Sequence, residues 1–187
     1  MDKIVIKGQR QLSGKVKISG AKNAVLPIMT AALMADGKST IHKVPNLRDT
    51  RTMIQLMEII GAKCSFKNDR LVINASTVNN PEAPYELVKT MRASFYVLGP
   101  LLARFGKVRV SLPGGCAWGP RPVDFHLKAL EKLGAKVTLR KGYILAEANK
   151  LKGANISFEF PSVGATGNIV MAAATADGRT VVENAAR

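Results

Sequence analysis

Three segments of the chain repeat one order of hydrophobic and polar residues. Each has a run rich in Ala and Leu with helical spacing, then a glycine, then residues that alternate between apolar and polar as in a strand. The three glycines are Gly37, Gly106 and Gly178, which lie 69 and 72 positions apart. This regular spacing predicts an internal repeat of about 70 residues.

The first two repeats also contain a second helix with a common ending. Residues 54–66 and 127–139 have apolar residues at i, i+3 and i+4, followed by Gly-Ala-Lys and a strand. Short turns at Asn68-Asp69 and Lys141-Gly142 lead into one further strand. The pattern within one repeat therefore predicts the element order β-α-β-α-β-β, which is typical of the α/β (α+β) class.

The third repeat is shorter than the other two. It starts at residues 161–163 and reaches only a helix and a strand before Arg187. Without the second helix and hairpin, an apolar sheet face would stay uncovered. We therefore expect this chain to be the N-terminal portion of a longer protein, truncated in its third repeat. Before the first repeat, alternating residues predict two short strands at 3–7 and 14–19.

Composition excludes several classes of protein. With 47% hydrophobic and 22% charged residues, the chain is globular rather than disordered. Neither a signal peptide nor an uncharged apolar stretch of about 18 residues is present, so we expect a cytoplasmic protein without a membrane partner. Two cysteines and two distant histidines are too few for a disulfide framework or a zinc site, and we expect neither metal nor cofactor.

The net charge of +15 admits three interpretations. The cations are a solvated surface, a cleft around a small phosphorylated ligand, or a groove for nucleic acid. They are scattered singly over the first 150 residues with few aromatic residues between them, which argues against a nucleic-acid partner.

The most unusual segment, residues 113–122, has three glycines and three prolines between a strand and a helix. Such a run is typical of a functional loop. Cys116 lies at its centre and Arg121 is five positions along. A nearby cation lowers the pKa of a thiol, so Cys116 is a candidate acid or nucleophile. Cys64 occupies a strand position and is expected to be structural.

Three weaker candidates share a position in the repeat. Lys22, Arg92 and Ser162 each stand at the start of the first helix of successive repeats. Taken singly, each also fits an exposed cation or a helix cap. Pseudo-symmetry, however, would bring the three helix N-termini to one place, where their amides favour an anion.

Four stretches carry a resemblance to a known family: SGAKNAVLPIMTAAL, VKTMRASFYVLGPLLARFG, SLPGGCAWGPRPVDFHLKALEKLGA and SVGATGNIVMAAAT. They resemble the UDP-N-acetylglucosamine 1-carboxyvinyltransferases, the enolpyruvyl transferases that begin bacterial peptidoglycan synthesis. The resemblance implies an inside-out α/β barrel of two lobes, each with three β-α-β-α-β-β units in pseudo-threefold symmetry. Residues 20–187 would form the lobe with the Cys loop. Residues 1–19 would belong at least partly to the other lobe, whose C-terminal part is missing here and is needed to complete the site.

The resemblance also implies a reaction. The enolpyruvyl group of phosphoenolpyruvate moves to the 3-hydroxyl of UDP-N-acetylglucosamine, and phosphate is released. Cys116 matches the family's proton donor, which forms a covalent adduct with phosphoenolpyruvate and is the target of fosfomycin. Lys22 matches a second catalytic residue.

The resemblance extends to substrate-binding positions, although Phe160 stands where the family commonly has Lys. The matching positions are Lys22, Asn23, Arg92, Arg121, Pro122, Val123, Asp124, Phe125, Phe160, Pro161, Ser162, Val163 and Gly164. Two alternatives stay open: an enzyme like 3-phosphoshikimate 1-carboxyvinyltransferase, and a phosphate- or nucleic-acid-binding module without catalysis.

Overall fold

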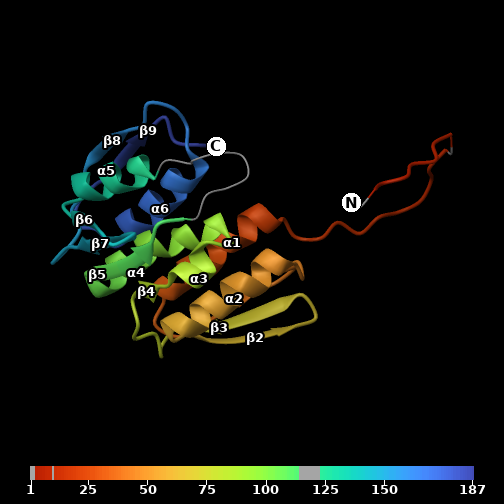
Figure 1. Cartoon of the computed structure of the whole chain (residues 1–187), viewed down its shortest axis with the longest axis horizontal. Coiled ribbons are helices and arrows are strands. Elements are labelled where there is room, and N and C mark those ends of the chain that lie inside the picture. The colour runs from red at the N-terminus through yellow and green to blue at the C-terminus, as the bar shows by residue number, and fades with distance from the viewer. Residues whose placement is uncertain (1–2, 10, 114–122) are drawn as a thin grey trace.

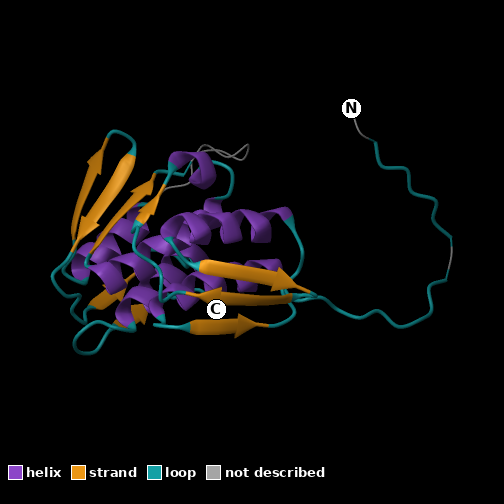
Figure 2. Cartoon of the chain, turned by 90° about the horizontal axis from the view of Figure 1, so that it is seen from below, coloured by secondary structure: helices purple, strands orange, loops and turns teal. Residues whose placement is uncertain are grey.

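Helices fill the middle of the molecule, and strands lie around them. Figure 1 shows this arrangement in the computed structural model, which describes residues 3–9, 11–113 and 123–187. Figure 2 shows the helices side by side with strands on their outer sides. The predicted mixed α/β class is therefore confirmed.

The first repeat has two helices, a short 3-10 helix and a three-stranded antiparallel sheet in the order β1-β3-β2. Its elements are α1 (Lys22–Ala31), η1 (Ala32–Met34), β1 (Lys38–Ile41), α2 (Arg48–Ile60), β2 (Lys63–Lys67) and β3 (Arg70–Asn74). Asn68 and Asp69, between β2 and β3, both have positive φ (49° and 57°), which matches the twist of a tight hairpin. The predicted turn is confirmed.

The second repeat has the same order with an added strand at its start. Its elements are β4 (Glu82–Ala83), α3 (Tyr85–Val88), η2 (Arg92–Val97), α4 (Leu98–Phe105), β5 (Lys107–Ser111), α5 (Asp124–Lys132), β6 (Lys136–Arg140) and β7 (Tyr143–Glu147). Its sheet runs β4-β5-β7-β6, and β4 is parallel to β5. The second predicted hairpin turn, at Lys141-Gly142 between β6 and β7, is also confirmed, and both residues have positive φ (50° and 76°).

The third repeat contributes β8 (Asn155–Ser157), α6 (Val163–Ala173) and β9 (Val181–Glu183). The parallel pair of β8 and β9 corresponds to that of β4 and β5. In the first repeat, β1 pairs with β3 on one side, and no described residue pairs with its other edge.

The two strands predicted before the first repeat are wrong for this structure. Residues 3–9 and 11–19 are extended but form no strand, and they run away from the other elements (Figure 1). Ile4 and Leu12 are 90% and 93% exposed. Alternating residues favour a strand only where a partner strand and a core are within reach, and this segment meets neither.

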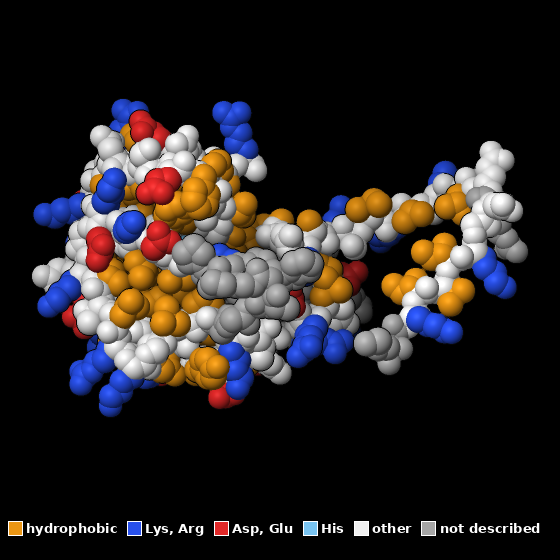
Figure 3. Space-filling view, turned by 45° about the horizontal axis from the view of Figure 1, so that its top comes forward, with side chains coloured by type: hydrophobic (Ala, Val, Ile, Leu, Met, Phe, Trp, Pro, Cys, Tyr) orange, Lys and Arg blue, Asp and Glu red, His pale blue; other side chains and the backbone are white. Residues whose placement is uncertain are grey.

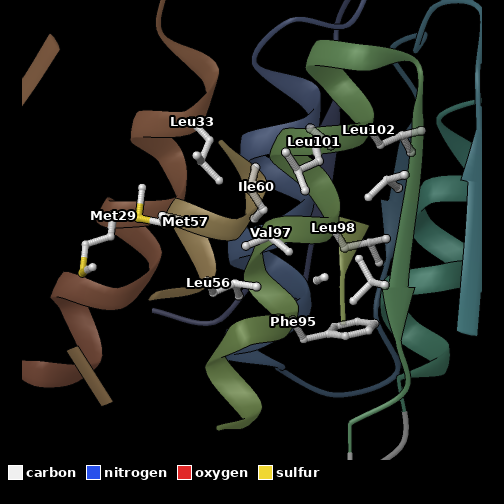
Figure 4. Close-up of a cluster of buried hydrophobic side chains, with 14 of the residues drawn as sticks. Met29, Leu33, Leu56, Met57, Ile60, Phe95, Val97, Leu98, Leu101 and Leu102 are labelled. Atoms are coloured by element: carbon white, nitrogen blue, oxygen red, sulfur yellow. The ribbon is translucent and has the colours of Figure 1, made fainter. Parts of the chain in front are cut away.

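The core extends from α1 and α2 through η2 to α4. Figure 4 shows Met29 of α1 beside Met57 of α2 at one side of the cluster and Leu98 and Leu101 of α4 at the other, and all four are fully buried. Helix α4 also packs against α6 and β5, so it is the central helix of the fold. Within the described residues, no helix combines the length and the apolar character needed to cross a bilayer.

Candidate functional site

A cavity of about 420 Å³ lies where the first helices of the three repeats begin. Asn23 comes from the start of α1, Arg92 from the start of η2, and Ser162 directly precedes α6. These three segments are about 70 residues apart in sequence. The predicted convergence of the three helix N-termini is therefore confirmed, with Asn23 rather than the predicted Lys22 in the cavity wall.

The wall of the cavity formed by α6 offers backbone donors. Ser162 is the N-cap of α6, and its Oγ accepts a hydrogen bond from the amide of Ala165 at 3.3 Å. The amides of Val163 and Gly164 have no hydrogen-bond partner among the described residues. Free amides in the first turn of a helix favour an anion in front of them.

Lys22 lies beside the cavity rather than in its wall. Its ammonium pairs with the Asp49 carboxylate at 2.7 Å, and the side chains are 44% and 32% exposed. Asp49 is in the first turn of α2, and sequence reasoning missed it. Nothing in the sequence around Asp49 indicates that its carboxylate meets a lysine 27 positions earlier.

His126, in the first turns of α5, is a second residue that sequence reasoning missed. It lines the cavity and is only 4% exposed. Burial, with a smaller contribution from the Arg92 guanidinium, lowers the pKa of its imidazole to about 4, and Asp124 opposes this shift. The side chain is therefore a neutral imidazole at neutral pH.

A buried amide holds the ring of His126. Asn168 of α6 is fully buried, and its Nδ2 is 3.0 Å from Nδ1 of His126. The ring of Phe95 meets the imidazole edge-on at 4.9 Å between centroids. The sequence offered one sign of this contact, because Asn168 is a lone amide side chain within an apolar helix. The sequence does not indicate which residue the amide contacts.

Two aromatic side chains, one from α5 and one from the segment before α6, lie close together. The rings of Phe125 and Phe160 are 4.7 Å apart between centroids, and Phe160 is 57% exposed. Phe125 also lines a hollow of about 210 Å³, together with Phe158 and Lys128. Thus the position where the resemblance would have placed a lysine offers an exposed ring.

The remaining predicted residues are placed as follows. Val123 lines the cavity together with Val163 and Gly164, Asp124 pairs with Lys128 at 3.7 Å, and Pro161 is exposed between Phe160 and Ser162. Cys116, Arg121 and Pro122 lie outside the described residues.

The other cysteine fits its predicted structural role. Cys64 is part of β2, and its side chain packs against the core. Burial, with a smaller contribution from Glu58, raises the pKa of its thiol to about 12. A thiol of this kind is a poor nucleophile at neutral pH.

The positive charge is spread over the surface. Figure 3 shows Lys and Arg side chains standing apart over the visible face, with no single basic patch. Among the described residues, no group of three or more His, Cys, Asp or Glu side chains could hold a metal ion.

Comparison with known proteins gives relatives over the whole chain. It is 59% identical to a UDP-N-acetylglucosamine 1-carboxyvinyltransferase of Chlorobaculum parvum and 52% identical to one of Lawsonia intracellularis, with 100% of this chain covered in both cases. The chain spans about 45% of the length of these relatives. The predicted resemblance to these transferases is confirmed.

Solved structures support the fold. The enolpyruvyl transferase NikO from Streptomyces tendae matches with a TM-score of 0.79 at 23% identity, over 94% of this chain and 41% of its own. EPSP synthase from Acinetobacter baumannii matches with a TM-score of 0.69 at 21% identity, over 90% of this chain and 40% of its own. The family model for EPSP synthase (3-phosphoshikimate 1-carboxyvinyltransferase) matches residues 6–187. By sequence and by fold, the chain belongs to the EPSP synthase family.

Proposed function

We propose that the protein containing this chain transfers the enolpyruvyl group of phosphoenolpyruvate to the 3-hydroxyl of UDP-N-acetylglucosamine. This is the first committed step of peptidoglycan synthesis, and it takes place in the cytoplasm. The observation that carries the proposal is the identity of 52–59% with UDP-N-acetylglucosamine 1-carboxyvinyltransferases along the whole chain. The EPSP synthase structure, in contrast, shares only 21%.

The cavity supports this choice because both substrates are anionic. The free amides at the start of α6, the Ser162 hydroxyl and Arg92 are suited to a diphosphate. Asn23 and Lys22, at the start of α1, are assigned to phosphoenolpyruvate. Lys22 already holds a carboxylate, that of Asp49, so its ammonium is placed to exchange this partner for a substrate anion.

The aromatic pair is assigned to the nucleoside end of the sugar nucleotide. Phe125 and Phe160 present ring surface next to the Ser162 segment. An exposed ring favours contact with a flat base rather than with phosphate. Position 160 would then contribute to binding of the nucleoside, where the family's lysine would contribute charge.

The chemistry is an addition followed by an elimination. Cys116 delivers a proton to the methylene carbon of phosphoenolpyruvate while the sugar 3-oxygen bonds to the neighbouring carbon. The sugar hydroxyl loses its proton to a general base, and the tetrahedral adduct then loses phosphate and a methyl proton. Arg121 joins Arg92 in offsetting the negative charge of the substrates. Pro122 to Phe125 and Phe160 to Gly164 line the sugar-nucleotide side.

The architecture we propose is an inside-out barrel whose helices lie within and whose sheets lie outside. Residues 20–187 form most of one pseudo-threefold lobe, and residues 1–19 belong at least partly to the other. Because the relatives are more than twice this length, the general base and a further arginine are assigned to the second lobe. Residues 1–187 alone should therefore show little or no turnover.

The test is an assay of phosphate release by the longer parent protein. We expect release that requires both phosphoenolpyruvate and UDP-N-acetylglucosamine and is lost in Cys116→Ala. Mass spectrometry after fosfomycin treatment should find one adduct, on Cys116, with Cys64 as the internal control. Release that requires shikimate 3-phosphate instead would overturn the proposed substrate, and an adduct on Cys64 would overturn the assignment of the catalytic thiol.

A non-catalytic binding module is the remaining alternative. It would bind RNA in a salt-dependent manner and would be indifferent to Cys116→Ala. Full turnover by residues 1–187 alone would contradict the two-lobe site.

A further inference from the structure

The walls of the cavity contain one polar side chain that the proposed reaction does not use. The side chain of His126 is only 4% exposed, yet it lines the cavity. Its Nδ1 has a partner in Asn168, while its Nε2 has no hydrogen-bond partner among the described residues. Gly164, which lies against Nε2, lines the same cavity, so a ligand or water there can complete the hydrogen bonding of this nitrogen.

The geometry around Asn168 fixes which ring nitrogen carries the proton. The amide of Gly99 donates to Oδ1 of Asn168 at 2.8 Å, and a backbone N–H can only donate, so this atom is the oxygen. The Nδ2 group then donates to the carbonyl of Phe95 at 3.1 Å and to His126 Nδ1 at 3.0 Å. Since both amide hydrogens are donated, Nδ1 accepts, and the proton of a neutral ring is on Nε2.

The protonated nitrogen lies against the start of α6. A Cβ atom added to Gly164 would be 3.3 Å from Nε2 of His126, so the absence of a side chain there leaves the nitrogen open. Gly164 has a free backbone amide, and Arg92 lines the same cavity. Neutral His126, the α6 amides and Arg92 therefore present donors to one space.

We propose that His126 donates a hydrogen bond from Nε2 to a phosphate oxygen of the substrate, and that Asn168 is the positioning residue that fixes this tautomer. The inference rests on the proposed function, since it takes the phosphate from one of the two anionic substrates. A neutral donor adds to the recognition of the anion without placing a third charge beside Arg92 and Asp124.

The first test needs no ligand. Long-range ¹H–¹⁵N spectra of the chain at neutral pH distinguish a protonated ring nitrogen from an unprotonated one. We expect His126 with a proton on Nε2 only, and the exposed His42 provides the internal reference. A proton on Nδ1, or on both nitrogens, would overturn the proposal.

The role of Asn168 is tested with Asn168→Asp, which replaces the donating amide by an accepting oxygen. We expect the proton of His126 to move to Nδ1 or to occupy both nitrogens. Asn149→Asp, the same change at an exposed position, should leave the ring unaltered. An unchanged Nε2–H tautomer in a folded Asn168→Asp variant would show that Asn168 does not fix it.

The role of His126 is tested by titrating wild-type chain with UDP-N-acetylglucosamine and, separately, with phosphoenolpyruvate. The ¹⁵Nε2 resonance should shift with the anion that supplies the oxygen, while His42 stays unchanged. Gly164→Ala, which places a methyl group against Nε2, should weaken that binding about ten-fold while the tautomer is retained.

Binding of both anions without a shift at Nε2 in either titration would overturn this inference and leave the proposed function standing. A chain in which neither anion moves Nε2 also contradicts it. Phosphate release by the parent protein then decides the proposed function separately.

Discussion

At the scale of single residues, environment matters more than residue type. Cys64 and His126 are both side chains that could do chemistry, but burial moves the pKa of each away from neutrality: to about 12 for the thiol and to about 4 for the imidazole. The thiol is left inert, whereas the imidazole is left neutral with its Nε2 beside the α6 amides. Sequence reasoning placed Cys64 correctly because strand periodicity is local.

Cys64 should resist alkylation in the folded chain. In a Cys116→Ser variant, where Cys64 is the remaining thiol, iodoacetamide at pH 8 should react at least ~100-fold more slowly than in urea-unfolded chain, because burial suppresses the thiolate. Mass spectrometry over time measures both rates. Equal rates before and after unfolding would contradict the burial of this thiol.

His126 should make stability depend on pH in a defined window. Its pKa in the folded chain lies below the ordinary value of about 6.5, so the unfolded chain takes up the proton first as the pH falls. Its contribution is complete above pH 6.5 and is lost toward pH 4, a change of roughly 3 kcal/mol in the free energy of unfolding. Urea unfolding over this range measures it.

The control for this measurement is the other histidine. His126→Gln should remove this part of the pH dependence, while His42→Gln should retain it. Identical pH profiles for wild type and His126→Gln would show that the buried imidazole is not neutral in the folded state.

At the scale of elements, local patterns predicted most of the fold. The helices and hairpins of the first two repeats follow from apolar spacing and from turns at Asn68-Asp69 and Lys141-Gly142, since both depend on neighbouring residues only. Features that depend on distant partners were not predicted correctly. Residues 14–19 alternate like a strand but meet none, and the contact of His126 with Asn168 joins residues 42 positions apart.

The packing of α4 against α6 depends on a glycine. A Cβ atom at Gly99 would be 2.3 Å from the backbone oxygen of Asn168, so the helices would have to separate. Gly99→Ala should lower the free energy of unfolding by about 1–3 kcal/mol. Gly8→Ala, with nothing within 4 Å, is the matched control and should be neutral in the same urea titration. Equal stability of the two variants would contradict this close approach.

At the scale of the whole molecule, the described core is independent of the N-terminal segment. Residues 3–9 and 11–19 are exposed, whereas Val25, Leu26 and Met29 of α1 are buried. The domain assignment of residues 1–19 could be inferred only from the family resemblance, because the described part of the chain leaves apolar side chains such as Ile4 and Leu12 uncovered.

Removal of residues 1–19 should change the free energy of unfolding by less than about 0.5 kcal/mol, because little surface is buried there. Removal of residues 1–31, which also deletes α1, should abolish cooperative unfolding. Urea titration followed by circular dichroism measures both. A large loss on the shorter deletion would show that the segment packs on the core.

The cavity is assembled from three helix starts that lie far apart along the chain. Contacts between such distant segments form late in folding, because long loops must close first. A fragment with one repeat contains only one part of the cavity wall. An anion that binds there should therefore raise the unfolding midpoint of all three repeats together. The shift caused by the ligand then reports how cooperatively the lobe unfolds.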